Sequence, residues 1–220
     1  MAIKIFVLGR PGSGKSTAAR YLKRLLQQQE VHVVHFNDYD ILQEMFLADI
    51  HHQKFRPTEH NGFDALDFSV LDDALQELEL RVREVETMTG VITIEFARDD
   101  YARALRLFSP AFLRGAYLLF IDTDLETCLH RVLERVKRAA SADDHPSLSE
   151  DLFRCYYAYE NRLYMSYYAR GEFALQQVEV VDNAGSLDDF ISTIKQFSEA
   201  VLVHEAARPR ERTLLGLGLG

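Results

Sequence analysis

Residues 3–17, "IKIFVLGRPGSGKST", decide the fold. The first six are mostly apolar and β-branched, which is the composition of a strand covered on both faces. The next eight, Gly9 to Ser16, fit the pattern G-x-x-x-x-G-K-S/T, in which glycines let the backbone turn so that successive N–H groups face phosphate oxygens. A helix that begins near Lys15 adds the positive end of its dipole. A strand, this loop and a helix in that order predict a site for the phosphates of a nucleotide.

The loop pattern also assigns roles to individual residues. We expect Lys15 to reach the β- and γ-phosphates of ATP, and the hydroxyl of Ser16 to bind Mg²⁺. The alternative interpretation is an ordinary glycine-rich turn between a strand and a helix. The residues expected to contact the nucleotide are Gly9, Pro11, Gly12, Ser13, Gly14, Lys15, Ser16 and Thr17.

Apolar runs of strand length alternate with longer segments of helical period along the rest of the chain. Such alternation is typical of an α/β fold with a parallel sheet and right-handed crossovers. We expect one domain over residues 1–207, with a polar insertion at 41–68, a lid-like loop at 138–149 and a mobile tail at 208–220. The expected strands are 3–8, 31–36, 91–96, 116–122 and 178–182, and the expected helices are 15–30, 69–88, 124–140, 149–169 and 187–203.

The composition argues against several classes of protein. The chain of 220 residues has 25 basic and 34 acidic residues, a net charge of −9, which disfavours broad binding to nucleic acid. No apolar run approaches the roughly 18–20 residues that cross a bilayer, so we expect no membrane partner. Two cysteines, Cys128 and Cys155, are too few for a disulfide framework and indicate reduced thiols in a cytoplasmic protein.

Two carboxylates follow the second expected strand in the segment "FNDYD". Asp38 and Asp40 come at the carboxyl end of a parallel strand, which is where open α/β sheets bind ligands. Phosphoryl transfer needs a carboxylate that orients or deprotonates the attacking oxygen, and Asp38 is our candidate for that role, with Asp40 as an acceptor contact. Either aspartate could instead cap the following helix.

A second polar group ends the third expected strand in "ITIEFARDDY". Glu95 closes an apolar run and is a candidate ligand of Mg²⁺ through water, and Arg98 lies three residues further on. We expect Arg98 to contact phosphate or the acceptor. The alternative is a surface ion pair between Arg98 and Asp99 or Asp100.

Three arginines lie on one face of the expected helix 124–140. Arg131, Arg135 and Arg138 are spaced i, i+4, i+7, and guanidinium groups bind phosphate oxygens in a bidentate manner. The alternative is a solvated face on which these arginines pair with Glu126 and Glu134.

The sequence "GRPGSGKST" resembles the P-loops of small-molecule and nucleotide kinases, within the P-loop NTPases. The D-x-D spacing of Asp38 and Asp40 is similar to that of shikimate-kinase-like enzymes. The segment with Glu95 and Arg98 resembles the third strand end of deoxynucleoside kinases. The resemblance implies a three-layer P-loop NTPase fold, with a five-stranded parallel sheet in the order 2-3-1-4-5 and helices on both faces.

The same resemblance gives roles to residues of the later half. The step from Arg131 to Arg135 resembles the arginine pair that opens the lid of adenylate-kinase-like enzymes, so Arg131 would bind the nucleotide and Arg135, with Arg98, would stabilise the transition state. The segment "VVDNAGSLDDF" looks like the turn whose backbone lies beside adenine, which Asn183 would shape. An ordinary loop explains Asn183 equally well.

The function expected from these residues is transfer of the γ-phosphoryl group of ATP, with Mg²⁺, to a small acceptor. We expect the acceptor, a nucleoside, nucleotide or hydroxyl metabolite, under the insertion 41–68, where Arg56 would contact an acceptor phosphate. Three alternatives stay open: an ATP-binding regulator that signals through a partner, a kinase of an RNA-borne hydroxyl, and a kinase of a nucleotide sugar. The tyrosine-rich segment 156–168 is typical of a core or of an interface between copies, so a homodimer is a further hypothesis.

Overall fold

A parallel sheet of five strands forms the centre of the protein in this computed structural model, which describes residues 2–58, 62–87, 90–137 and 149–207. The sheet order is β2-β5-β1-β6-β7, and all four neighbouring pairs are parallel. Counted within this sheet alone, that is the expected order 2-3-1-4-5. The strands are β1 (Ile3–Leu8), β2 (Val33–Asn37), β5 (Val91–Phe96), β6 (Tyr117–Asp122) and β7 (Gln177–Asp182).

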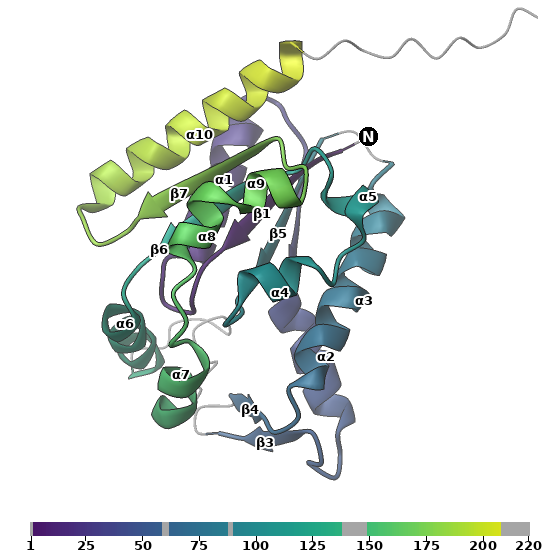
Figure 1. Ribbon diagram of the computed structural model, residues 1–220, viewed down its shortest axis with the longest axis vertical. Helices are drawn as coiled ribbons and strands as arrows, with labels where there is room; N and C mark the ends of the chain where they lie inside the picture. Colours follow the sequence, from purple (N-terminus) through teal and green to yellow (C-terminus); the bar gives the residue numbers. More distant parts are fainter. Residues whose placement is uncertain (1, 59–61, 88–89, 138–148, 208–220) are drawn as a thin grey trace, which may run out of the picture.

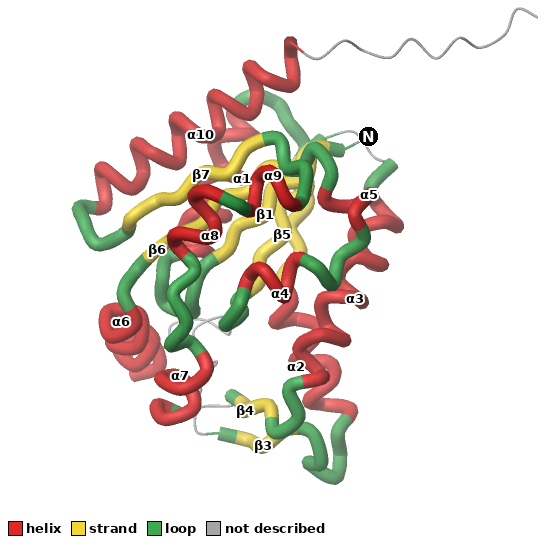
Figure 2. The backbone as a smooth tube through the Cα atoms, viewed as in Figure 1, coloured by secondary structure: helices red, strands yellow, loops and turns green. Residues whose placement is uncertain are grey.

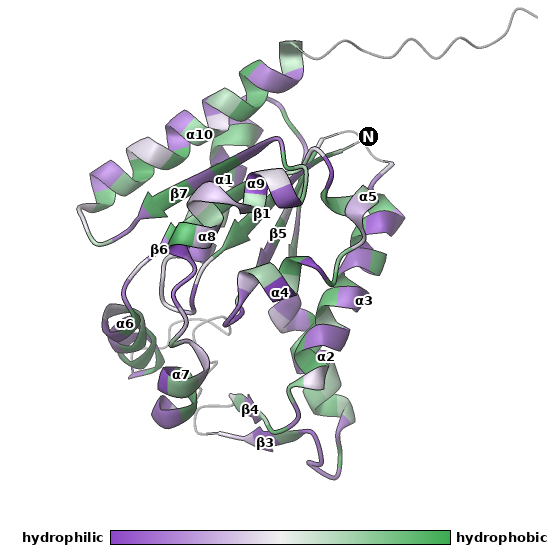
Figure 3. Cartoon of the chain, in the orientation of Figure 1, coloured by the Kyte–Doolittle hydropathy of each residue, from purple (hydrophilic) through white to green (hydrophobic). Residues whose placement is uncertain are grey.

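Helices cover the sheet on both faces, as Figures 1 and 2 show. The α/β class and the three-layer arrangement expected from the sequence are therefore confirmed. Five of the helices are α1 (Lys15–Gln28), α3 (Ser69–Val85), α4 (Tyr101–Leu105), α5 (Pro110–Leu113) and α6 (Leu125–Lys137). The last, α10 (Leu187–Ala207), packs against α1 and carries hydrophobic and hydrophilic residues in alternation along its length (Figure 3).

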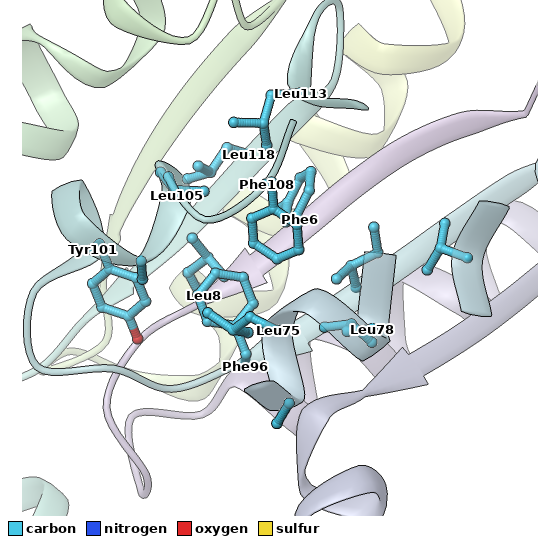
Figure 4. Close-up of a cluster of buried hydrophobic side chains, with 14 of the residues drawn as sticks. Phe6, Leu8, Leu75, Leu78, Phe96, Tyr101, Leu105, Phe108, Leu113 and Leu118 are labelled. Atoms are coloured by element: carbon cyan, nitrogen blue, oxygen red, sulfur yellow. The ribbon is translucent and has the colours of Figure 1, made fainter. Parts of the chain in front are cut away.

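Strand β1 shows why the sheet has two covered faces. Side chains alternate along a strand, and here Ile5 and Val7 enter one core, under α1 and α10, whereas Phe6 and Leu8 enter the other. The second core is rich in aromatic rings, and Figure 4 shows Phe6 beside Phe108 within it. From Ile5 to Leu8 both faces of β1 are fully buried, so the loop that follows this strand is anchored in the core.

The insertion after the second strand begins with a helix and ends with a small hairpin. Helix α2 (Asp38–Ala48) is capped by Asn37, whose side chain accepts a hydrogen bond from the Tyr39 N–H at 3.0 Å. A two-stranded antiparallel sheet follows, made of β3 (Phe55–Pro57) and β4 (Phe63–Ala65). In Figure 1 this hairpin lies near α7, at the lower end of the molecule.

The single helix expected over 149–169 is wrong. The chain forms α7 (Glu150–Tyr156), α8 (Arg162–Tyr167) and α9 (Ala169–Glu172) instead. The break after Tyr157 leaves the carbonyl oxygens of Tyr157 and Tyr159 to accept hydrogen bonds from the buried Arg10 side chain, at 2.9 Å each. The lid-like loop at 138–149, apart from Ser149, and the tail at 208–220 lie outside the described residues.

Candidate active site

The phosphate-binding loop joins β1 to α1 and depends on glycines for its shape. Gly9, Gly12 and Gly14 have φ angles of +148°, +82° and +107°, a region that other residues rarely adopt. A Cβ on Gly12 would overlap the carbonyl oxygen of Cys128 in α6, and one on Gly14 would lie 2.5 Å from Asn183 Nδ2. The loop is therefore packed tightly against its neighbours and could not accept side chains at these positions.

Lys15, Ser16 and Glu95 lie together at the start of α1. Lys15 Nζ is 3.9 Å from Glu95 Oε1 and donates to the Arg10 carbonyl at 3.3 Å, and the Ser16 hydroxyl donates to Glu95 Oε1 at 2.7 Å. Burial lowers the pKa of the Lys15 ammonium below its usual range, and the charges of Glu95 and Asp38 oppose that shift. Ser16 and Glu95 are 79 positions apart in the chain and are brought into contact by the fold.

The oxygens at this point suit a magnesium ion. Glu95 Oε2 is buried and has no hydrogen-bond partner among the described residues, while His35 Nε2 lies 3.8 Å from it. An unpartnered carboxylate oxygen beside a hydroxyl is a fitting start for Mg²⁺, which binds oxygen ligands and keeps several waters. Ser16 and Glu95 are thus the residues that could hold the ion.

Asp38 and Arg98 form a buried ion pair at the ends of β2 and β5. Arg98 Nη1 lies 2.5 Å from Asp38 Oδ2, and the guanidinium also donates to the carbonyl of Leu71 at 2.6 Å. Burial raises the pKa of the Asp38 carboxyl, while the neighbouring Arg98 acts in the opposite direction. Arg98 pairs neither with Asp99 nor with Asp100, so the surface ion pair considered for it is not observed.

A pocket of about 280 Å³ opens beside this ion pair. It lies between the beginning of α3, the loop that leads into α4, and α7. The rings of Phe68 and Tyr156 pack against each other, with 5.1 Å between centroids, and both line the pocket. We call it the acceptor-side pocket; its lining is Phe68, Leu71, Asp72, Arg98, Asp99, Asp100, Arg103, Ala104, Leu152, Cys155 and Tyr156.

The arginines of α6 and Asn183 meet the loop from the other side. Arg131 donates to the Asn183 carbonyl at 3.0 Å, and Asn183 Nδ2 donates to the Ser13 carbonyl at 2.7 Å. Arg135 is close enough to Lys15 for its charge to lower the pKa of that residue, and its Nε is buried without a hydrogen-bond partner in the described parts of the chain. Arg138 lies outside the described residues.

Two residues expected to bind the acceptor lie elsewhere. Arg56 pairs with the buried Asp64 across the hairpin at 2.7 Å, and the other oxygen of Asp64 accepts from the Ser149 N–H at 3.1 Å. Asp40 is an exposed residue of α2. Neither Arg56 nor Asp40 lines the acceptor-side pocket. Among the described residues of the insertion, Phe68 alone lines the pocket.

Several residues that hold the site together were not singled out from the sequence. Arg10 anchors the loop to the segment after α7, with a further bond to the Thr123 carbonyl at 3.0 Å. The Tyr101 hydroxyl accepts from the Gly9 N–H at 2.9 Å, and Asn161 accepts from the Tyr101 N–H at 3.0 Å. The sequence signal for Arg10 was its position inside the phosphate-binding loop. Its side chain is only 7% exposed in the structure, and a buried charge must find partners.

The fold and this loop define a nucleotide-binding protein of the P-loop type. The sequence model of the family described as "AAA domain" matches residues 5–150, about two thirds of the chain, and the protein belongs to that family. No curated protein sequence matches the chain. Across the described residues, none of the helices has the length and apolar character needed to span a membrane.

Solved structures share the fold at low sequence identity. Kti12 of Chaetomium thermophilum in complex with ADP-AlF3 is 16% identical, with a TM-score of 0.56 and coverage of 91% of this chain and 97% of that one. A sugar kinase from Janibacter sp. HTCC2649 is 13% identical, with a TM-score of 0.55 and coverage of 92% and 95%. The APS kinase CysC of Mycobacterium tuberculosis in complex with AMPPNP and APS is 14% identical, with a TM-score of 0.52 and coverage of 94% and 98%.

Proposed function

We propose that the protein is a kinase that transfers the γ-phosphoryl group of ATP to a hydroxyl of a small molecule. The observation that carries the proposal is the position of Asp38, a buried carboxylate whose partner Arg98 lines the acceptor-side pocket and whose charge also acts on Lys15 of the phosphate-binding loop. Asp38 is thus connected through Arg98 to a pocket of metabolite size, and through its charge to the phosphate-binding loop. The sugar kinase and the APS kinase that share the fold are consistent with this chemistry.

The residues divide the reaction between them. The loop from Gly9 to Thr17 would bind the phosphates of ATP, with Lys15 at the β- and γ-phosphates, and Ser16 and Glu95 would hold Mg²⁺, which neutralises charge on the phosphates. Asp38 would take the proton of the acceptor hydroxyl while that oxygen forms a bond to the γ-phosphorus. The bond from the γ-phosphorus to its bridging oxygen breaks, and ADP leaves.

Two arginines have different places in this scheme. Arg98 is engaged with Asp38 and with backbone carbonyls, so we assign it the orientation of the base and of the acceptor. Arg135, near Lys15, is the better candidate for stabilising charge on the transferred group. Arg131 and Asn183 support the loop from outside and would border the nucleotide.

The test is ATP turnover with a panel of acceptors. We expect ADP release to rise above the rate without acceptor for at least one compound among sugars, nucleosides, nucleotides, nucleotide sugars and bulk tRNA. Asp38→Asn should lower the stimulated rate by about 10²–10⁴-fold while a fluorescent ATP analogue still binds. Asp40→Asn, an exposed aspartate on the same helix, is the matched control and should retain the rate.

An ATP-binding regulator is the main rival, and the same experiment separates the two. If ATP binds but no compound of the panel stimulates ADP release, and Asp38→Asn leaves the basal rate unchanged, the kinase proposal fails. A thermal melt of each variant excludes unfolding as the cause, because Asp38→Asn leaves the buried Arg98 without a charged partner.

A further inference from the structure

We propose that the acceptor-side pocket selects an uncharged polyhydroxyl molecule with an apolar face, of the size of a nucleoside or a single glycoside, and disfavours the phosphorylated form of the same molecule. The proposal rests on the proposed function in one respect, namely that the ligand of this pocket is the phosphoryl acceptor. The chemistry of the pocket itself is argued from its lining.

The charges of the lining leave a surplus of carboxylates. Arg98 is paired with Asp38, and Arg103 is paired with Asp72 at 2.7 Å. Asp99 and Asp100 also line the pocket, and neither has an ion pair within the described residues. Both cations are therefore already neutralised and two carboxylates are not. An anionic group would have to displace an existing pair and approach these carboxylates, which is unfavourable at short range.

The polar atoms of the lining suit hydroxyl groups. Asp100 Oδ1 already accepts from the Arg103 N–H at 3.0 Å, and Asp99 is hydrogen-bonded to the Tyr156 hydroxyl. An ionised carboxylate has about four acceptor positions and only accepts hydrogen bonds, so Asp99 and Asp100 can still bind ligand O–H groups. Arg103 lines the same pocket with a side chain that is 65% exposed, and the N–H groups of its guanidinium can donate to a hydroxyl oxygen. A hydroxyl both donates and accepts, and can therefore serve both kinds of group in one small space.

The remaining lining is apolar and aromatic. Phe68 and Tyr156 form one wall, and Leu71, Ala104 and Leu152 contribute aliphatic surface. Aromatic rings pack against the flat apolar face of a ring system in a ligand. This wall favours a nucleoside or a glycoside over a flexible acyclic polyol.

The volume sets an upper limit on size. At about 280 Å³ the pocket is at the lower end of the range of roughly 300–1,000 Å³ that is typical of small-molecule sites. One sugar ring or one nucleoside fits that space, whereas a dinucleotide or a nucleotide sugar would extend beyond it.

The chain contains a natural probe of this pocket. Cys155 is exposed and lines it, whereas Cys128 is buried beneath the phosphate-binding loop. Alkylation of Cys155 in the full chain, without ATP, measures occupancy directly. The probes are matched pairs that differ by one phosphate: adenosine and AMP, uridine and UMP, methyl glucoside and methyl glucoside 6-phosphate.

We expect at least one uncharged compound to slow Cys155 alkylation by about fivefold or more at millimolar concentration. Its phosphorylated partner should give the same protection only at about a tenfold higher concentration, and this ratio of concentrations measures the selectivity of the pocket. The double variant Asp99→Asn, Asp100→Asn keeps the hydrogen-bonding shape, removes the surplus charge and should narrow that ratio. Asp151→Asn is the control, because Asp151 lies on α7 but outside the lining, and it should leave the ratio of protecting concentrations unchanged.

Three results would overturn the proposal: equal or stronger protection by the phosphorylated members, no protection by any uncharged member, or an unchanged ratio in the double variant. Phosphoryl transfer is measured in a separate assay, so that failure of the proposed ligand class can be distinguished from failure of the kinase proposal. Transfer to phosphorylated acceptors alone would overturn the ligand class and leave the kinase standing. Protection by uncharged ligands, without stimulated ADP release by any compound of the panel and with an unchanged basal rate in Asp38→Asn, would leave the ligand class standing and overturn the kinase.

Discussion

At the scale of single residues, the environment of Asp38 sets the pH dependence of the proposed reaction. Burial raises the pKa of this carboxyl above its ordinary value of 3.8. The base is active when ionised, so kcat/KM should fall as the pH falls through that pKa, and the raised pKa moves the acid limb to higher pH than an ordinary aspartate gives.

The measurement is a pH profile of kcat/KM with the best acceptor. The profile of Asp38→Asn still contains the titration of ATP itself. An acid limb of kcat/KM that is present in the wild type and lost in this variant therefore belongs to Asp38. A wild-type limb centred at or below about pH 4 would contradict the assignment of Asp38 as a buried base.

At the residue scale, the sequence predicted which residues lie at the site but not how their side chains pair. The pattern of the loop placed Lys15 and Ser16, and the ends of the apolar runs placed Asp38 and Glu95. The partner of Arg98 was not predictable, because the choice between Asp38, Asp99 and Asp100 depends on side-chain rotamers and on how deeply the guanidinium is buried. Their catalytic roles stay predictions.

At the scale of elements, Arg10 connects the phosphate-binding loop to the wall of the acceptor-side pocket. Its side chain donates to three carbonyls, of Thr123, Tyr157 and Tyr159, and α7 directly precedes the last two. Arg10→Ala should lower the free energy of unfolding by about 2–5 kcal/mol, because it leaves buried carbonyls without donors. Urea unfolding measures this.

Glu160→Gln is the control for that prediction. Glu160 also pairs with Arg10, but its side chain is 68% exposed, and an exposed pair contributes less than about 1 kcal/mol. Equal losses in the two variants would mean that the ion pair, and not the carbonyl contacts, holds the segment.

The same contacts explain why the single helix expected over 149–169 is divided. Residues 149–169 have the composition and spacing of a continuous helix, and nothing local marks a break after Tyr157. The break is favoured by Arg10, which comes almost 150 positions earlier in the chain. A periodicity argument considers only neighbours along the chain and could not include it.

At the scale of the whole molecule, the two thiols should report on packing. Cys128 is fully buried between α6, α7 and the phosphate-binding loop, and burial raises its pKa to about 11. At about pH 8 only one such buried thiol in roughly a thousand is ionised, so Cys128 should react with an aromatic disulfide only when the protein unfolds in urea. Cys155 is exposed and should react quickly in the folded protein. Cys155→Ser should abolish the fast phase, and a fast phase that survives would contradict the burial of Cys128.

The fold as a whole was the most predictable part of the protein. The sequence of a strand that is buried on both faces is a continuous apolar run, and β1, β5 and β6 were all recognisable for that reason. The insertion was not recognisable: β3 and β4 have three residues each, too few to show an alternating pattern, and the placement of their hairpin against the start of α7 depends on the buried Asp64.

The central position of β1 has a consequence for how the chain is made. Ile3 pairs in register with Val91, and Ile5 with Tyr117, so β1 does not have both of its neighbours until more than 100 further residues have been joined. Chains fold during synthesis from the N-terminal end, but this strand must wait for distant partners. Nucleotide binding is therefore a property that a nascent chain acquires late, and an abandoned fragment that ends before β6 would carry the glycine-rich segment without the sheet that holds it.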